Sequence, residues 1–292
     1  MIGLAGMHRP WWTLAALALI RTGASACAGP LPAVADPYPN AASGYAVAID
    51  DQLLWGHRLD GRRAPASLAK LLTAIVLLES NWNPDRLLTI SDRAAHATRP
   101  RSGVRAGDKV RAEDALMAML VQSANDACLA LIGSTASAQD ESSALTAFAE
   151  LMNAHALKLG MRDSHFVQPC GFDADGQYST VSDLLRLAKA AYADPRIARV
   201  VSQAHAALRT AAGMELSFNN TNQLLGRLDG VVGMKTGYTA RAGYCLIALA
   251  EQSGHRVWLV MLDSRERWWT AHRILSDGLA AAARRDAHNR GT

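Results

Sequence analysis

Three short patterns in the sequence contain the residue types needed for nucleophilic catalysis. They are Ser67-Leu68-Ala69-Lys70 (S-x-x-K), Ser123-Ala124-Asn125 (S-x-N) and Lys235-Thr236-Gly237 (K-T-G). A serine hydroxyl is a weak nucleophile until a neighbouring base accepts its proton. Residues three positions apart share one face of a helix, so the Lys70 amine can reach the Ser67 hydroxyl. The first pattern therefore supplies a nucleophile and its base.

The other two patterns supply groups that activate the base, move protons and bind substrate. Burial and a second cation nearby, Lys235, can lower the pKa of Lys70 until its amine accepts a proton. Ser123 can relay that proton to a leaving amine. Asn125 can hold a substrate amide, and these roles together indicate acyl transfer.

Backbone groups complete the predicted site. The N–H groups of Ser67 and Tyr238 are candidates for an oxyanion hole. Gly237 has no side chain, so a substrate backbone can lie against its strand. Ser67 lies at the start of a predicted helix, where the field favours developing negative charge.

The order and setting of the patterns carry more weight than any one of them. Average composition gives about one S-x-x-K, about one S-x-N and about 0.06 K-T-G by chance in a chain of this length. A further S-x-N, Ser217-Phe218-Asn219, lies too close to K-T-G to be the middle pattern. Only five of the 30 Lys and Arg residues are lysines, and Lys70 and Lys235 are two of them. Because Arg keeps its proton, we expect that it cannot replace either lysine.

Composition limits the classes of protein to consider. Of 292 residues, 50% are hydrophobic, which is enough for a packed core and excludes a disordered chain. The formal net charge of +4 comes without clustered basic runs, so we predict no nucleic-acid binding. No glycine-rich phosphate loop and no metal-ligand spacing occur, so we predict no cofactor and no metal.

The two ends of the chain are expected to lie outside the catalytic domain. Residues 1–28 resemble an export signal, with a positive start, a short apolar run and an A-x-A site, and cleavage after Ala26 or Ala28. Lipid attachment at Cys27 and a disordered tail are the alternatives. Residues 29–43 are a proline-rich linker, 44–283 the domain, and 284–292 a basic tail. We predict an exported protein without a stable membrane anchor.

The pattern of apolar residues predicts strands near both ends and helices between them. Expected strands are 44–50, 53–59, 231–236, 243–251 and 256–263, with strand-like patterning from about residue 199. Expected helices are 68–78, 113–121, 126–132, 142–159, 180–192 and 268–283. This order predicts an α/β (α+β) fold, in which both ends of the chain build one sheet around a helical region.

We assign no chemical role to the cysteines or to one acidic stretch. Cys128, Cys170 and Cys245 are an odd number without C-x-x-C, which predicts no disulfide framework. Cys128 and Cys245 are interpreted as small buried hydrophobic residues. Residues 173–176 resemble a calcium loop but lack its later Glu, so we interpret them as a turn.

From about residue 44 to 279 the chain resembles the serine D-Ala-D-Ala carboxypeptidases, which are penicillin-binding proteins of low molecular mass. Besides the three patterns, the resemblance includes Asn220-Thr221-Asn222-Gln223-Leu224-Leu225 and Ala242-Gly243-Tyr244-Cys245. It implies a β-lactamase/transpeptidase-like fold. In that fold an antiparallel sheet of about five strands has helices on both faces, and a helical subdomain carries the S-x-N loop.

The resemblance also implies roles, substrates and location. Ser67 would form the acyl ester, Lys70 would be the base, and Ser123 would transfer protons. An arginine before the last helix often holds the substrate carboxylate in this family, and the register favours Arg267 over Arg265. The predicted substrate-binding residues are Asn125, Lys235, Thr236, Gly237, Tyr238 and Arg267. Peptidoglycan stem peptides in the periplasm would be substrates, and β-lactam antibiotics covalent inhibitors.

Two departures from the family pattern bear on these expectations. The loop Gln168-Pro169-Cys170-Gly171-Phe172 stands where Asn-Pro-x-Gly-Leu is common, and it lies outside the three motifs, so we expect little effect on the site. Many members of the family continue into a β-rich second domain and a C-terminal anchor, and from this sequence we expect neither. The shorter form also occurs in relatives that cut D-amino-acid crosslinks, which keeps a D,D-endopeptidase as an alternative.

A β-lactamase and a non-enzymatic binding protein are less consistent with the sequence. A class A β-lactamase needs a separate carboxylate for deacylation, and Glu150 lies inside a predicted helix without the required spacing. A non-enzymatic cell-wall binding protein would be expected to lack Ser67 or Lys70, and both are present. We therefore predict a carboxypeptidase.

Overall fold

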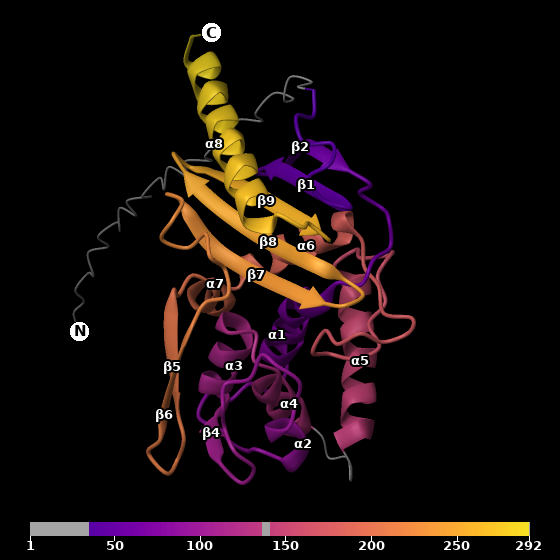
Figure 1. Ribbon diagram of the computed structural model, residues 1–292, viewed down its shortest axis with the longest axis vertical. Helices are drawn as coiled ribbons and strands as arrows, with labels where there is room; N and C mark the ends of the chain where they lie inside the picture. The colour runs from indigo at the N-terminus through magenta and orange to yellow at the C-terminus, as the bar shows by residue number, and fades with distance from the viewer. Residues whose placement is uncertain (1–34, 136–140, 292) are drawn as a thin grey trace, which may run out of the picture. The chain divides into compact units, whose positions relative to one another are not determined.

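An antiparallel sheet of five strands lies at the centre of the structure, a computed structural model that describes residues 35–135 and 141–291 (Figure 1). The strands are ordered β2 (Gln52–His57), β1 (Gly44–Ile49), β9 (His255–Leu262), β8 (Gly243–Gln252) and β7 (Val231–Thr239). The prediction of a sheet built from both ends of the chain is confirmed. The predicted export signal lies outside the described residues.

Both faces of this sheet are buried, as its uninterrupted apolar strands require. Every residue of β1 is buried. Alternate side chains on a strand point to opposite faces, so Tyr45 and Val47 join one core while Ala46 and Ala48 join the other. Asp50 forms the tight turn into β2 with a left-handed backbone, φ 54°.

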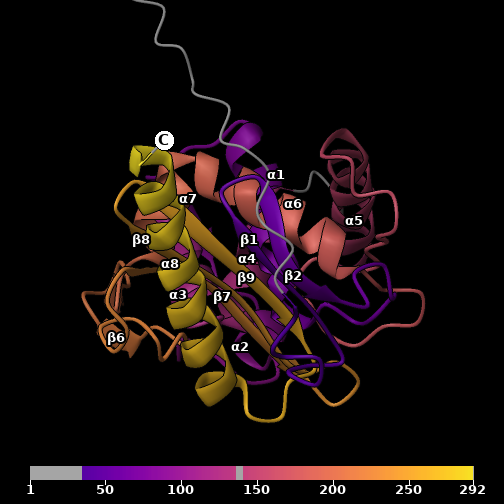
Figure 2. The same cartoon turned by 90° about the horizontal axis from the view of Figure 1, so that it is seen from above.

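Helices cover the two faces. On one face α8 (Arg267–Gly291) packs Ile274 and Leu275 against β1, β8 and β9. On the other face lie α6 (Val181–Ala193) and α7 (Pro195–Val201). Figure 2 shows α8 and α6 on opposite sides of the strands.

A helical region adjoins one end of the sheet and carries the first two motifs (Figure 1). Its helical elements are η1 (a 3-10 helix, Ala66–Ala69), α1 (Lys70–Glu79), α2 (Asp92–Ala95), α3 (Ala112–Val121), α4 (Asn125–Gly133) and α5 (Glu141–Lys158). Its short strands form two pairs, β3 (Leu87–Thr89) with β4 (Lys109–Arg111) and β5 (His205–Arg209) with β6 (Glu215–Asn219). Nine of the ten residues of α1 are buried, so this helix holds the S-x-x-K motif inside the protein.

Two segments differ from the predicted elements. Residues 195–201 form helix α7, where strands were expected from about residue 199. Pro195 occupies the first turn, and the Asp194 carboxylate accepts a hydrogen bond from the Arg196 N–H, which together start a helix. Residues 284–291, expected as a tail, continue α8. Among the described residues, no helix combines the length and hydrophobicity needed to cross a bilayer.

A disulfide joins Cys128 in α4 to Cys170 in the loop after α5. The prediction of no disulfide is therefore wrong, and Cys128 is not a free buried thiol. The spacing of 42 residues gave no signal, whereas the fold brings the two Cα atoms to 5.9 Å, within bonding range. Cys245 is free and buried, as predicted.

We predict that His255 stabilises the fold below neutral pH. Its Nδ1 and Nε2 lie 2.8 Å from carboxylates of Asp50 and Asp286 respectively, and the Asp286 and Asp50 contacts raise the pKa of His255. A raised pKa in the folded state means that stabilisation is present at low pH and is lost as pH rises through that pKa. His255→Gln should therefore lower the free energy of unfolding at pH 5.5, by on the order of 1 kcal/mol more than at pH 9.

Urea unfolding at the two pH values measures this difference. His205, whose Nδ1 meets the Asn219 amide oxygen instead of a carboxylate, is the matched position. His205→Gln is the control for loss of an imidazole as such, and equal losses for His255→Gln at both pH values would contradict the prediction.

Candidate active site

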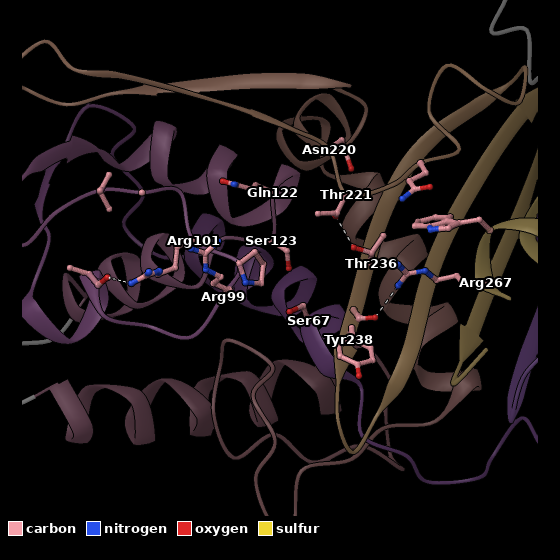
Figure 3. Close-up of a pocket in the computed structure, with 17 residues that line it drawn as sticks. Ser67, Arg99, Arg101, Gln122, Ser123, Asn220, Thr221, Thr236, Tyr238 and Arg267 are labelled. Atoms are coloured by element: carbon pink, nitrogen blue, oxygen red, sulfur yellow. Dashed lines mark hydrogen bonds between the residues drawn. The ribbon is translucent and has the colours of Figure 1, made fainter. Parts of the chain in front are cut away.

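Ser67 lies where η1, the end of β7 and the loop between α3 and α4 meet (Figure 3). It lines a cavity of about 850 Å³. The cavity is also lined by Arg99, Arg101, Gln122, Ser123, Asn220, Thr221, Thr236, Gly237, Tyr238 and Arg267. A second hollow of about 570 Å³ reaches Ser67 from the side of residues 96–100 and 171–173. Members of all three sequence motifs therefore surround one accessible hydroxyl.

The S-x-x-K motif crosses from a 3-10 turn into an α-helix. Ser67 lies in η1, and Lys70 is the first residue of α1, whereas the sequence predicted a single α-helix from residue 68. Ala66 has a left-handed backbone, φ 50°, at the start of the turn. The tighter turn still brings Lys70 Nζ to 3.0 Å from Ser67 Oγ.

The Lys70 amine is fully enclosed and has three hydrogen-bond acceptors. Nζ donates to Ser67 Oγ, to Asn125 Oδ1 at 2.8 Å and to the carbonyl oxygen of Cys170. Burial disfavours the ammonium and lowers the pKa of Lys70 to about 7. Near neutral pH the amine can therefore be uncharged and able to accept the Ser67 proton.

The S-x-N motif occupies the turn from α3 into α4. Ser123 has φ 64°, a region that costs a residue with a side chain on the order of 1 kcal/mol, and it lines the same cavity as Ser67. The side chain of Asn125 makes two contacts within the protein. Its Oδ1 accepts from Lys70, and its Nδ2 donates to the Thr98 carbonyl at 2.9 Å. Before any ligand binds, Asn125 therefore orients the lysine.

The K-T-G motif lies on β7, beside η1. Lys235 is buried, and its Nζ donates to the Thr236 carbonyl at 3.0 Å. Burial lowers the pKa of Lys235 well below its usual value, and repulsion from Lys70 and Arg267 lowers it further. Thr236 Oγ1 donates to Thr221 Oγ1 at 2.7 Å, which fixes its hydroxyl at the cavity wall (Figure 3).

Gly237 allows β7 to pack directly against the segment that carries Ser67. A Cβ at this position would lie 2.9 Å from the Ala66 Cβ and 3.1 Å from the Ser67 nitrogen. The sequence predicts contact of this glycine with substrate, and the structure shows its contact within the protein. The next residue, Tyr238, is exposed, and its ring lies against that of Tyr244.

Arg267 lies at the start of α8 and lines the cavity, whereas Arg265 lines a neighbouring hollow that does not include Ser67. Arg267 Nη1 donates to the carbonyls of Gly237 at 3.1 Å and Cys245 at 3.0 Å. Its guanidinium also lies over the Trp268 ring, 4.2 Å from the centroid. These contacts hold a cation beside the K-T-G strand.

Sequence reasoning missed two contributors to the site. The Cys170 carbonyl accepts from Lys70, although the loop 168–172 was expected to matter little. A backbone carbonyl has no residue-type signal, so only the fold reveals it. Thr221 contacts Thr236 and lies in the segment Asn220–Leu225, which the resemblance included without assigning it a role.

The features that the sequence analysis set aside lie apart from this cavity lining. Glu150 is on α5, and the second S-x-N, at residues 217–219, is on β6. In residues 35–135 and 141–291, no group of His, Cys, Asp and Glu side chains is arranged to hold a metal ion.

Comparison with known proteins gives one consistent result. Residues 33–266 match the sequence profile of the D-alanyl-D-alanine carboxypeptidase family. The chain is 31% identical over 285 residues to the D-alanyl-D-alanine carboxypeptidase of Streptomyces sp. strain K15, covering 91% of this chain and 98% of that protein. The crystal structure of the same Streptomyces enzyme, described as a DD-transpeptidase, superimposes with a TM-score of 0.76 at 29% identity, covering 82% of this chain and 97% of that one.

Two further relatives show the range of the similarity. An ampicillin-bound penicillin-binding protein of Listeria monocytogenes is 31% identical, with a TM-score of 0.67, covering 82% of this chain and 98% of that one. A D-alanyl-D-alanine endopeptidase of Escherichia coli is 30% identical over 232 residues, covering 77% of this chain and 73% of that protein. The chain spans about half the length of other curated carboxypeptidases that it matches.

We predict that Gly237→Ala slows covalent labelling of the protein by a fluorescent penicillin at least about tenfold. The added methyl would push β7 away from η1. A displacement of on the order of 1 Å between reacting groups lowers the reaction rate strongly. Labelling rates measured by gel fluorescence test this. The control is Gly133→Ala at the end of α4, where an added Cβ meets nothing within 4 Å, and it should label at the wild-type rate. Equal rates for Gly237→Ala and wild type would contradict the prediction.

Proposed function

The chain belongs to the D-alanyl-D-alanine carboxypeptidase family of penicillin-binding serine peptidases, and on this premise we propose that it removes the terminal D-Ala of peptidoglycan stem peptides through an acyl-enzyme on Ser67. One observation carries the assignment of Ser67. The buried Lys70 amine lies 3.0 Å from the Ser67 hydroxyl, in the cavity that the other two motifs also reach.

Acylation begins with transfer of the Ser67 proton to Lys70. Oγ then attacks the carbonyl carbon of the penultimate D-Ala, and the peptide oxygen becomes an oxyanion. The backbone N–H groups of Ser67 and Tyr238 donate hydrogen bonds to that oxyanion. The lowered pKa of Lys70 supports this role, because an uncharged amine is present at neutral pH.

Collapse of the tetrahedral intermediate breaks the peptide bond and needs a proton for the leaving amine. Ser123, on the cavity wall, relays the proton from Lys70 to that nitrogen. The free carboxylate of the terminal D-Ala lies against Thr236, Lys235 and Arg267. A bound carboxylate favours the charged form of Lys235, so binding offsets the cost of its burial.

Hydrolysis of the ester by water completes the cycle and restores Ser67. A β-lactam acylates the same hydroxyl, but its amine stays attached through the opened ring and cannot diffuse away. The ampicillin-bound Listeria relative supports a stable penicilloyl ester on this chain. The penicillin is therefore a covalent probe of the acylation step alone.

The proposed location is the bacterial periplasm, reached through an export signal in residues 1–28. The proposed catalytic domain begins at residue 44 and extends beyond the expected residue 283, because α8 continues to residue 291. A peptidase of cell-wall stem peptides must meet its polymer outside the cytoplasm. The disulfide supports an exported protein, because disulfides persist in oxidising compartments.

A D,D-endopeptidase is the second candidate. It would cut crosslinks by the same steps and differ only in the larger leaving amine. The similarity to the Escherichia coli endopeptidase supports it. Assays of a pentapeptide and of a crosslinked muropeptide dimer separate the two: free D-Ala from the pentapeptide alone supports the carboxypeptidase, and cleavage of the dimer supports the endopeptidase.

We predict that Ser67→Ala gives no fluorescent penicillin label and no D-Ala release. The variant lacks the oxygen that forms the ester. Gel fluorescence and a D-amino-acid oxidase assay measure the two activities. The folded state is checked by circular dichroism, and labelling of a folded Ser67→Ala variant would show that another residue is acylated.

We predict that acylation depends on the uncharged form of Lys70. The rate of penicillin labelling should fall about tenfold for each pH unit below about 7, where the amine becomes protonated. Lys70→Arg keeps a permanent charge and should lower the rate by about 100-fold or more at pH 8. Labelling reactions quenched at set times between pH 5 and 9 measure the rates of the wild type and of Lys70→Arg. A flat wild-type profile would contradict the role of Lys70 as base.

A further inference from the structure

We propose that the Cys128–Cys170 disulfide is a positioning device for the base, because it ties together the two segments that supply two of the three acceptors of the Lys70 amine. The inference rests on the proposed role of Lys70. It gives a function to a bond that joins a motif helix to a loop outside the three motifs.

Each cysteine of the disulfide lies close to one acceptor of the Lys70 amine. Asn125, whose Oδ1 accepts from Lys70, begins α4, and Cys128 follows three positions later, about one turn along the same helix. Cys170 carries the second acceptor on its own backbone, since its carbonyl oxygen accepts from Lys70. The covalent bond therefore closes a compact ring of contacts through Lys70, Asn125, Cys128 and Cys170.

Other contacts hold the loop against η1 and α1. Thr73 of α1 donates to the Pro169 carbonyl at 2.7 Å. A Cβ on Gly171 would lie 2.2 Å from the Ala66 carbonyl oxygen, so the loop lies directly on the turn that carries Ser67. Within the loop, the Cys170 N–H donates to the Gln168 side chain at 2.9 Å. The disulfide adds the attachment to the S-x-N helix.

Orientation of the Cys170 carbonyl matters because this part of the site is buried. Lys70, Cys128 and Cys170 are all fully buried. When the loop carbonyl turns away, Ser67 and Asn125 still contact the amine, but one N–H of this buried group loses its acceptor, and an entering water replaces it. Water would restore much of the stability of the ammonium, so the site would hold its proton more tightly.

The charged groups around the amine do not supply an alternative partner. Lys235 on β7 and Arg267 at the start of α8 are cations, and Lys70 acts on Lys235 by repulsion. In α4, the Asp126 carboxylate accepts from the backbone N–H groups of Ser102 and Gly103. After the loop, Asp173 accepts from Thr239. The orientation of the lysine therefore depends on its neutral acceptors.

Formation of the bond makes the site depend on oxidation. The two thiols lose two electrons and two protons to an external disulfide, which becomes two thiols as the Sγ–Sγ bond forms. An enzyme in which Cys128 and Cys170 remain thiols would carry every motif residue but a loosened acceptor for its base.

The test is the pH profile of the rate of penicillin labelling in Cys128→Ala/Cys170→Ala, which keeps the residue 170 carbonyl but removes the bond. The acidic midpoint is the pH at which this rate falls to half its maximum on the acidic side. We expect this midpoint to rise by about one pH unit and the rate at pH 6 to fall about tenfold, with Ser67 still labelled. Leu275→Ala in α8, on the opposite face of the sheet, is the control for lost stability, and its midpoint should match the wild type.

Two results would overturn the proposal. One is a wild-type midpoint in the folded double variant, and the other is an equal shift in Leu275→Ala. A second measurement needs no variant: the phosphine TCEP reduces the disulfide to two thiols as its phosphorus takes up an oxygen atom from water. Wild-type protein so reduced, with the free Cys128 and Cys170 confirmed by mass spectrometry, should show the same shift, and an unchanged midpoint would also overturn the proposal.

Failure of this proposal is distinguishable from failure of the proposed function. If Lys70 is not the base, the oxidised wild-type protein has no acidic midpoint near pH 7 and Lys70→Arg labels normally. If only the disulfide proposal is wrong, the wild-type midpoint is present and Lys70→Arg is slow, while loss of the bond changes neither midpoint nor rate.

Discussion

The burial of one amine, Lys70, is the constraint on which the rest of the site depends. A lysine side chain without water is costly unless its hydrogen-bond donors have acceptors. The protein brings those acceptors from three segments, η1, α4 and the loop 168–172, and excludes solvent around them. Burial makes the ammonium unfavourable, and the same burial makes the neutral amine useful as a base. Packing and chemistry therefore have a common origin here.

Much of the fold follows from the order of apolar patterns. The strands near both chain ends and the long helices were predicted because their hydrophobic periodicity is strong and their boundaries carry Gly, Pro or capping residues. Helix α7 was missed because only seven residues, 195–201, form it, and its apolar residues also suit a strand. Short elements depend on capping and on tertiary contacts more than on periodicity.

The site could be predicted where side chains carry the chemistry, and not where the backbone does. Ser67, Lys70 and Thr236 belong to recognisable motifs and come together as the motifs require. The carbonyl of Cys170 and the pairing of Cys128 with Cys170 depend on which segments meet in space. Gly237 was identified, but its contact with η1 becomes apparent only when the strand and the turn are placed together.

The pairing of β1 with β9 also constrains when the protein can fold. Gly44 lies opposite Leu262, more than 200 residues later in the chain, and the Ser67 turn needs β7 beside it. Contacts at such sequence separation form late and slowly, because a large loop must close before they stabilise anything. A chain still emerging from a ribosome or a translocation channel therefore has its nucleophile long before it has a site, and reactivity begins only with the completed molecule.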